Sequence, residues 1–262
     1  MDILGRHNVT VSGKGERFMM FAHGFGCDRN MWRFVAPAFE ETHRIVLFDH
    51  VGCGRSDSSL YDPGRHSSLQ GYADDVVAIG RALGLEEAIF VGHSVSAMIG
   101  ILAARTAPGM FGKLVLIGPS PCYINDGDYR GGFERSDIDE LMTFMDSNFL
   151  GWSAALTPQI MGNPDRPELA EELNNSFCRA DPDIAKSFAR VTFLSDNRSD
   201  LEGVAIPALI LQCSEDLIAP DSVGAYVHER LAGSALVRLR ATGHCPNLSA
   251  PEETVEAIRE WI

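Results

Sequence analysis

The chain has 262 residues and a formal net charge of −14, from 22 basic and 36 acidic side chains. This acidic balance argues against nucleic acid or an anionic membrane surface as a partner. No apolar run approaches the length of a membrane span, and the first residues lack the basic and apolar blocks of a signal peptide. The sequence therefore predicts a cytoplasmic, monomeric globular protein.

The first half of the chain alternates apolar strands with helical patterns. Continuous apolar runs are typical of strands buried on both faces of a parallel sheet. The predicted strands are residues 8–12 at an edge, 17–22, 44–48, 88–91 and 113–118. Helical spacing is found at residues 31–41 and 98–104, and at 69–83, where Gly84 is the expected C-cap.

The alternation then stops and later resumes. Four helical patterns, at 138–149, 152–161, 167–177 and 184–193, occupy a stretch without comparable strands. Strand 208–212, helix 221–231, strand 235–239 and a final helix follow, the last with a capping box from Ser249 to Glu252. We predict an α/β fold with a mostly parallel sheet and helices on both faces. Residues 1–120 and 195–262 would form its core, and 121–194 an inserted four-helix lid.

The stretch from residue 88 to 103 carries the strongest chemical signal. An apolar strand leads directly into Gly92-His93-Ser94-Val95-Ser96, and a small, apolar helix follows. This pattern predicts a nucleophile elbow, in which Ser94 occupies a strained turn and its hydroxyl stands clear of the sheet. Ser96 stands where such a turn usually has a second glycine.

A serine nucleophile needs a base, and the base needs an acid that fixes its tautomer. His244 follows the last predicted strand, and Asp216 follows the strand before it. Active residues of parallel sheets gather at the carboxyl ends of strands, so we expect Ser94, Asp216 and His244 to form a catalytic triad. Glu215 and Asp221 are the rival acids.

The developing oxyanion also needs hydrogen-bond donors. One expected donor is the backbone N–H of Val95, directly after the nucleophile. The other is the backbone N–H of Phe25, since the flanking Gly24 and Gly26 allow this loop to turn inward.

The remaining reactive residue types favour structural roles. His93 and His23 are expected to pack in the interior, and Cys245 to be a small buried thiol rather than a second nucleophile. The other histidines, at 7, 43, 50, 66 and 228, are expected at the surface or satisfied in the core. The six cysteines are scattered without a metal-site pattern, and no phosphate loop follows the glycines at 52 and 54, so we expect no metal and no cofactor.

Several longer segments are recognisable. HGFGCDRNMW, FDHVGCGRSD, GHSVSAMIG, SPCYINDGDYRGGFE, LQCSEDLIAP and GHCPNLSAPEE together resemble the RsbQ-like bacterial stress-response regulators and the related plant karrikin and strigolactone receptors. The resemblance extends over essentially the whole chain, and the lid segment from 164 to 189 is closer to the bacterial branch.

This resemblance implies an α/β-hydrolase fold with a V-shaped lid over a deep apolar pocket, and it assigns the triad to the same three residues. It also implies a regulatory phosphatase with a sensor domain as protein partner. The pocket residues it suggests are Phe25, Tyr123, Phe133, Trp152, Phe193 and Ile218.

The sequence thus predicts a serine hydrolase of small hydrophobic esters or lactones, butenolide-like ones included, with a signalling or stress-regulatory use. One alternative is a ligand-binding signalling module with negligible turnover; others are a C–C bond hydrolase and a cofactor-free haloperoxidase. The acidic face at Glu168, Glu171 and Glu172 is the candidate docking surface, against the simpler interpretation of a solvated helix face.

Overall fold

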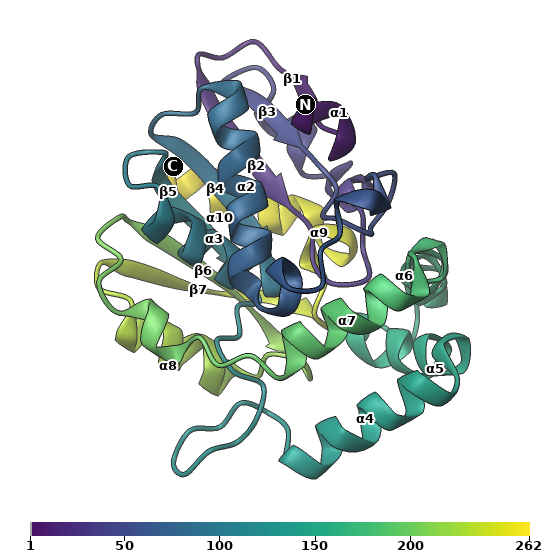
Figure 1. The fold of residues 1–262 in the computed structure, drawn as a ribbon. Helices are drawn as coiled ribbons and strands as arrows, with labels where there is room; N and C mark the ends of the chain where they lie inside the picture. The colour runs from purple at the N-terminus through teal and green to yellow at the C-terminus, as the bar shows by residue number, and fades with distance from the viewer. Residues whose placement is uncertain (1) are drawn as a thin grey trace.

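A single twisted sheet forms the centre of the computed structural model, which describes residues 2–262 (Figure 1). Its strand order is β1-β3-β2-β4-β5-β6-β7, and every neighbouring pair is parallel except β1 with β3. The strands are β1 (Thr10–Ser12), β2 (Arg17–Ala22), β3 (His43–Leu47), β4 (Ala88–His93), β5 (Phe111–Ile117), β6 (Ala208–Glu215) and β7 (Ser234–Thr242). The predicted edge strand and the predicted parallel sheet are confirmed.

Helices cover both faces of this sheet, because alternate strand residues such as Met19 and Met20 are buried on opposite sides. One face packs against α2 (Leu69–Leu83), α3 (Val95–Thr106) and α8 (Asp221–Arg230). The other packs against α9 (Pro246–Ser249), α10 (Pro251–Trp261) and the 3₁₀ helices η1 (Arg29–Trp32) and η2 (Ala36–Phe39). Helix α2 has the predicted bounds, and Gly84 ends it in the left-handed conformation at φ 65°.

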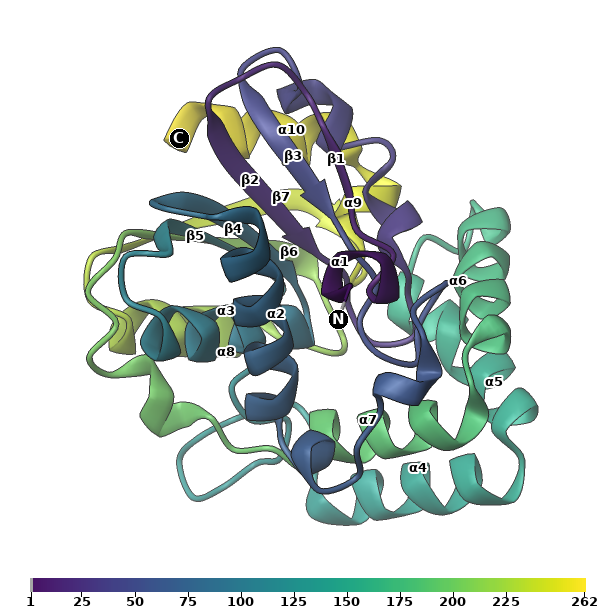
Figure 2. The same cartoon turned by 45° about the horizontal axis from the view of Figure 1, so that its top comes forward.

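Four further helices lie between β5 and β6 and gather beyond the carboxyl ends of the strands (Figure 2). They are α4 (Arg135–Ser147), α5 (Phe149–Met161), α6 (Pro167–Arg179) and α7 (Pro182–Phe193). Asn148 separates the first two, since its side chain accepts a 2.9 Å hydrogen bond from the Gly151 N–H and caps α5. The predicted helix over 138–149 therefore begins and ends slightly too late.

Two local predictions are wrong. The apolar spacing at 31–41 does not give an α-helix but η1 and η2, because Pro37 has no N–H to continue a helical ladder. The capping box from Ser249 to Glu252 is also absent. Ser249 is instead the last residue of α9, and Ala250 precedes α10 without a side-chain cap.

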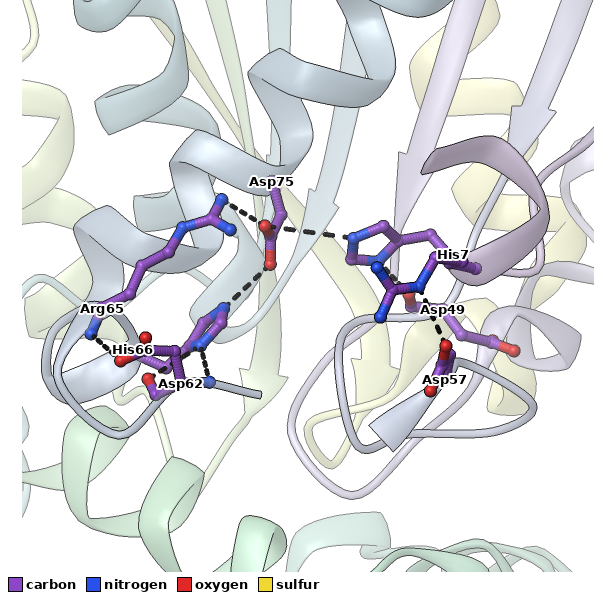
Figure 3. Close-up of polar contacts among 8 residues, drawn as sticks. His7, Asp49, Asp57, Asp62, Arg65, His66 and Asp75 are labelled. Carbon is purple, nitrogen blue, oxygen red and sulfur yellow. Dashed lines mark hydrogen bonds and ion pairs between the residues drawn. The ribbon is translucent and has the colours of Figure 1, made fainter. Parts of the chain in front are cut away.

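A buried cluster of charged and polar side chains ties the N-terminal segment to α2 (Figure 3). Asp75, only 2% exposed, pairs with Arg65 and lies 3.0 Å from His66 Nε2 and 3.9 Å from His7 Nε2. His7 Nδ1 in turn lies 3.1 Å from the carbonyl oxygen of Asp49. The Asp75 carboxylate in α2 therefore holds the segment of Arg65 and His66 and the segment of His7 in place.

Two further expectations concern the state of the cysteines and the presence of membrane-spanning helices. Cys27, Cys53, Cys122, Cys213 and Cys245 are free and buried, and the side chain of Cys178 lies outside the described residues. Among helices of the described residues, none is both long and apolar enough to cross a membrane.

Candidate active site

The turn between β4 and α3 has the geometry expected of a nucleophile elbow. Ser94 adopts φ 57° and ψ −126°, a conformation that L residues rarely occupy. Close packing explains the glycine before it, because a Cβ on Gly92 would lie 2.4 Å from the carbonyl oxygen of Ser96. The Ser94 hydroxyl is therefore held at the carboxyl edge of the sheet.

Three side chains from separate strand ends form a continuous chain of hydrogen bonds. His244 Nε2 lies 2.7 Å from Ser94 Oγ, and His244 Nδ1 lies 2.7 Å from Asp216 Oδ2. An ionised carboxylate can only accept, so the Nδ1 atom carries the proton and Nε2 is free to accept from the serine hydroxyl. The structure brings together all three residues that the sequence suggested.

Asp216 is held ionised in this position. Burial raises the pKa of its carboxyl, but His244 and the N–H groups of Ile218 and Ala219 outweigh burial, so the pKa is lowered overall. Both N–H groups donate to Oδ1, at 2.8 and 3.0 Å. The two rival acids point elsewhere: Glu215 is exposed, and Asp221 pairs with Arg238 at 2.6 Å.

Backbone contacts hold the His244 loop from two sides. His93 Nε2 donates to the His244 carbonyl at 2.7 Å, and burial lowers the pKa of His93 to about 3, so its ring stays neutral. From the side of the helices between β5 and β6, the carbonyl of Ile160 at the end of α5 accepts from the His244 N–H at 2.8 Å. Asn163 Nδ2 also donates to the Thr242 carbonyl at 3.0 Å. The packing role predicted for His93 thus includes one specific hydrogen bond.

The loop after β2 approaches the nucleophile from the opposite side. A Cβ on Gly24 would lie 2.6 Å from His93 Nδ1 and 3.2 Å from Ser94 Cβ, so only glycine fits there. In the part of the chain that the structure describes, neither the Phe25 N–H nor the Val95 N–H has a hydrogen-bond partner. Two free donors beside a serine suit a developing oxyanion.

The space beside Ser94 is small and apolar. The cavity measures about 20 Å³, roughly the room that a single water needs. It is narrow because α6 sends Leu173 and Phe177 into it, and the Phe177 ring stands edge-on to Phe25 at 5.2 Å. The deep pocket that the resemblance implies is therefore closed in this conformation.

The pocket residues suggested from the sequence divide into two groups. Those that line the cavity are Phe25, Tyr123, Phe193 and Ile218. Phe133 and Trp152 do not line it. Phe133 belongs to the segment before α4, where its N–H donates to Tyr123 O, and Trp152 packs behind Phe177 at 5.7 Å.

Sequence reasoning missed the two α6 residues in the cavity. A signal for them existed, because Leu169, Leu173 and Phe177 are four residues apart and so share one face of a helix. Opposite them, a Cβ on Gly26 would lie 2.1 Å from the Phe177 ring. This glycine is thus required by the packing of α6 as well as by its own turn at φ 74°.

Ion pairs join α6 to the core at the middle of the helix and at its last residue. Glu172 pairs with Arg33 at 2.6 Å, and Arg179 pairs with Asp28 at 3.3 Å. One of the three glutamates in the candidate docking face is therefore a bridge to the core, whereas Glu168 is exposed.

A thiol lies directly beside the catalytic histidine in the sequence. Burial raises the pKa of the Cys245 thiol well above its ordinary value, so it stays protonated beside the histidine. In the described residues, no group of three or more histidine, cysteine or acidic side chains is arranged to hold a metal ion.

A mostly parallel sheet that presents an elbow serine, a carboxylate and a histidine in this chain order defines the α/β-hydrolase class. The chain belongs to the Alpha/beta hydrolase family, whose sequence profile matches residues 19–257.

Individual relatives are similar over nearly their full length. The chain is 39% identical to Karrikin insensitive 2 receptor CA of Petunia hybrida over 257 residues, covering 98% of this chain and 95% of that one. It is 38% identical to Strigolactone esterase RMS3 of Pisum sativum over 251 residues, covering 95% and 94%. A solved hydrolase from Oleispira antarctica matches with a TM-score of 0.97 at 42% identity, covering 99% of this chain and 96% of that one. The predicted relation to the plant receptors is confirmed.

Proposed function

We propose that this protein is a serine hydrolase of small hydrophobic esters or lactones, butenolide-like lactones included. The observation that carries the proposal is the pair of 2.7 Å contacts from Ser94 through His244 to Asp216, beside an apolar cavity. The esterase and receptor names of the relatives support the same chemistry.

In the proposed reaction, Ser94 Oγ attacks the acyl carbon while His244 Nε2 takes its proton. The N–H groups of Phe25 and Val95 donate to the resulting oxyanion. When the C–O bond breaks, His244 returns the proton to the leaving alkoxide. Water, deprotonated by His244, then hydrolyses the acyl-serine and restores the hydroxyl. Asp216 keeps the imidazole in its tautomer and stabilises the imidazolium.

We also propose that residues 121–194 act as a lid between the core segments 1–120 and 195–262, and that ligand occupancy is signalled through it. A cavity of about 20 Å³ is too small for an ester, so entry requires Phe177 to move together with part of α6. Movement of α6 strains its ion pairs to Arg33 and Asp28. Ligand entry would thus change the outer surface of the lid.

We propose that the protein that receives this signal is a cytoplasmic regulatory phosphatase with a sensor domain. The docking surface proposed for it is the face with Glu168 and Glu171. Reversing these two charges to lysine should weaken partner binding and leave ester turnover unchanged. Glu172 is left intact because its pair with Arg33 holds α6.

The test of the enzymatic proposal is the mass of the protein after incubation with p-nitrophenyl esters and butenolides. We expect one acyl adduct on Ser94 and turnover of short acyl groups, both abolished in Ser94→Ala. Turnover that persists in Ser94→Ala, or an adduct on another residue, would refute the mechanism. A ligand-binding module without turnover would instead bind butenolides and form no adduct.

A further inference from the structure

A second buried hydrogen-bond network lies directly behind the oxyanion loop. It joins His23 at the end of β2, His50 after β3 and Ser96 in the first turn of α3, which are at most 1% exposed. None of the three belongs to the triad. Ser96 also stands where the elbow pattern usually has glycine, so its hydroxyl is an addition to that pattern.

The hydrogen bonds determine where each proton lies. Ser96 Oγ donates its only proton to the His23 carbonyl oxygen at 2.5 Å. The contact of 2.8 Å between His50 Nε2 and Ser96 Oγ therefore has the imidazole as donor. Burial lowers the pKa of His50 well below its ordinary value, so this ring is neutral and carries its proton on Nε2.

The same logic fixes the tautomer of His23. The backbone N–H of His50 donates to His23 Nε2 at 3.0 Å, so His23 has its proton on Nδ1. That Nδ1–H donates to the carbonyl oxygen of Gly24 at 2.9 Å, and the N–H of Cys27 reaches the same oxygen at 3.3 Å. The Gly24 carbonyl is thus held by two donors.

The Gly24 carbonyl and the Phe25 N–H belong to one planar trans peptide, in which the two groups point in opposite directions. Whatever fixes the carbonyl therefore also fixes the direction of the N–H. The Phe25 N–H is the proposed oxyanion donor and has no partner among the described residues. The network therefore ends at the peptide whose N–H is proposed to donate to the oxyanion of the transition state.

We propose that Ser96 and His50 are positioning residues that hold the oxyanion peptide through His23. The inference rests on the proposed function, because it assigns these residues to the same oxyanion hole. Removing the Ser96 hydroxyl leaves the His23 carbonyl and the His50 Nε2–H buried without partners. Reorganisation around these two groups turns the Gly24–Phe25 peptide away from its productive direction.

The primary test compares Ser96→Ala with Thr254→Val, which also removes a buried hydroxyl that donates to a backbone carbonyl, but in α10. For p-nitrophenyl acetate, Ser96→Ala should lower kcat by about tenfold or more and leave KM within about twofold, because a misaligned donor loses part of the roughly 10²–10³-fold effect of removing the donor outright. Thr254→Val should leave both constants unchanged. Titration with a phosphonate counts the folded sites, so kcat is expressed per active serine.

A second readout separates positioning from general loosening. A trifluoromethyl ketone forms a tetrahedral adduct with Ser94 and places an oxyanion in the hole, whereas the matching secondary alcohol does not. Ser96→Ala should weaken binding of the ketone by the same factor by which it lowers kcat/KM. Binding of the alcohol should stay unchanged. His50→Gln, which can keep a donor near Ser96, should retain most activity, and His50→Leu should match Ser96→Ala.

Several results would overturn the inference. These are a kcat of Ser96→Ala within twofold of wild type, equal weakening of ketone and alcohol, or equal activity of His50→Gln and His50→Leu. If Ser96→Ala does not fold, the comparison of His50→Gln with His50→Leu decides the inference. Wild-type turnover and its loss in Ser94→Ala decide the proposed function separately, so the failure of one proposal is distinguishable from that of the other.

Discussion

The closed cavity leads to a prediction about Phe177, the α6 ring that fills the space beside Ser94. Its side chain is 1% exposed and packs against Phe25 and Trp152 at 5.2 and 5.7 Å. Replacing it with alanine should lower the free energy of unfolding by about 3 kcal/mol, near the lower limit for buried Phe→Ala changes, since the new space joins an existing cavity. Urea unfolding measures this loss.

The same variant should change substrate selectivity. Each additional methylene buried in the enlarged pocket contributes about 0.8 kcal/mol, which is about fourfold in kcat/KM. From p-nitrophenyl butyrate to hexanoate, the ratio of kcat/KM values should rise about fifteenfold relative to wild type for two methylenes. Phe144→Ala, at a ring in α4 that is 42% exposed, is the control. An unchanged ratio in Phe177→Ala would show that this ring does not limit acyl length.

Three further predictions concern the triad and the buried charges. Ser94→Ala, His244→Ala and the double variant should each lower kcat by about 10⁴-fold or more without adding, because triad members act as a unit; additive losses in steady-state assays would contradict this. Asp75→Asn should destabilise the fold by about 3 kcal/mol in urea unfolding, since it leaves Arg65 and the two histidines without their carboxylate, and a loss under 1 kcal/mol would contradict this. Acid should also destabilise the protein: burial lowers the pKa of His93 to about 3 from an ordinary value of 6.5, and that of His23 is lowered too. Below pH 6.5 the unfolded chain binds more protons, so His93 alone lowers the stability present at pH 7.5 by ~1.4 kcal/mol per pH unit as the pH drops towards 3. His23 adds a loss in the same direction. A flat stability between pH 7.5 and 5.5 would refute it.

Much of the site could be predicted because its signals are local. The strand, turn and helix around Ser94 are contiguous, and the loops with Asp216 and His244 each follow a recognisable strand. A parallel sheet then places all three at one edge. The four helices between β5 and β6 were recognisable for the same reason, since their apolar periodicity is continuous.

What sequence reasoning missed depends on contacts between distant segments. Helical spacing in α6 shows which face is apolar, but not that Phe177 reaches as far as Gly26 in the core. The network of His23, His50 and Ser96 joins three separate segments of the chain, and no pattern within one segment indicates it. Periodicity alone also did not account for Pro37, which limits its segment to 3₁₀ turns.

The hydrogen bond from the His244 N–H to Ile160 makes the end of α5 part of the catalytic machinery. An opening motion that carried α5 outward would pull on the loop of the base and separate His244 from Ser94. A motion confined to α6 would leave that loop in register. On the proposed function, we infer that α5 stays on the core throughout turnover and that substrates enter past α6. We expect a conformer in which α5 has left the core to lack an aligned triad and therefore not to hydrolyse a bound ligand.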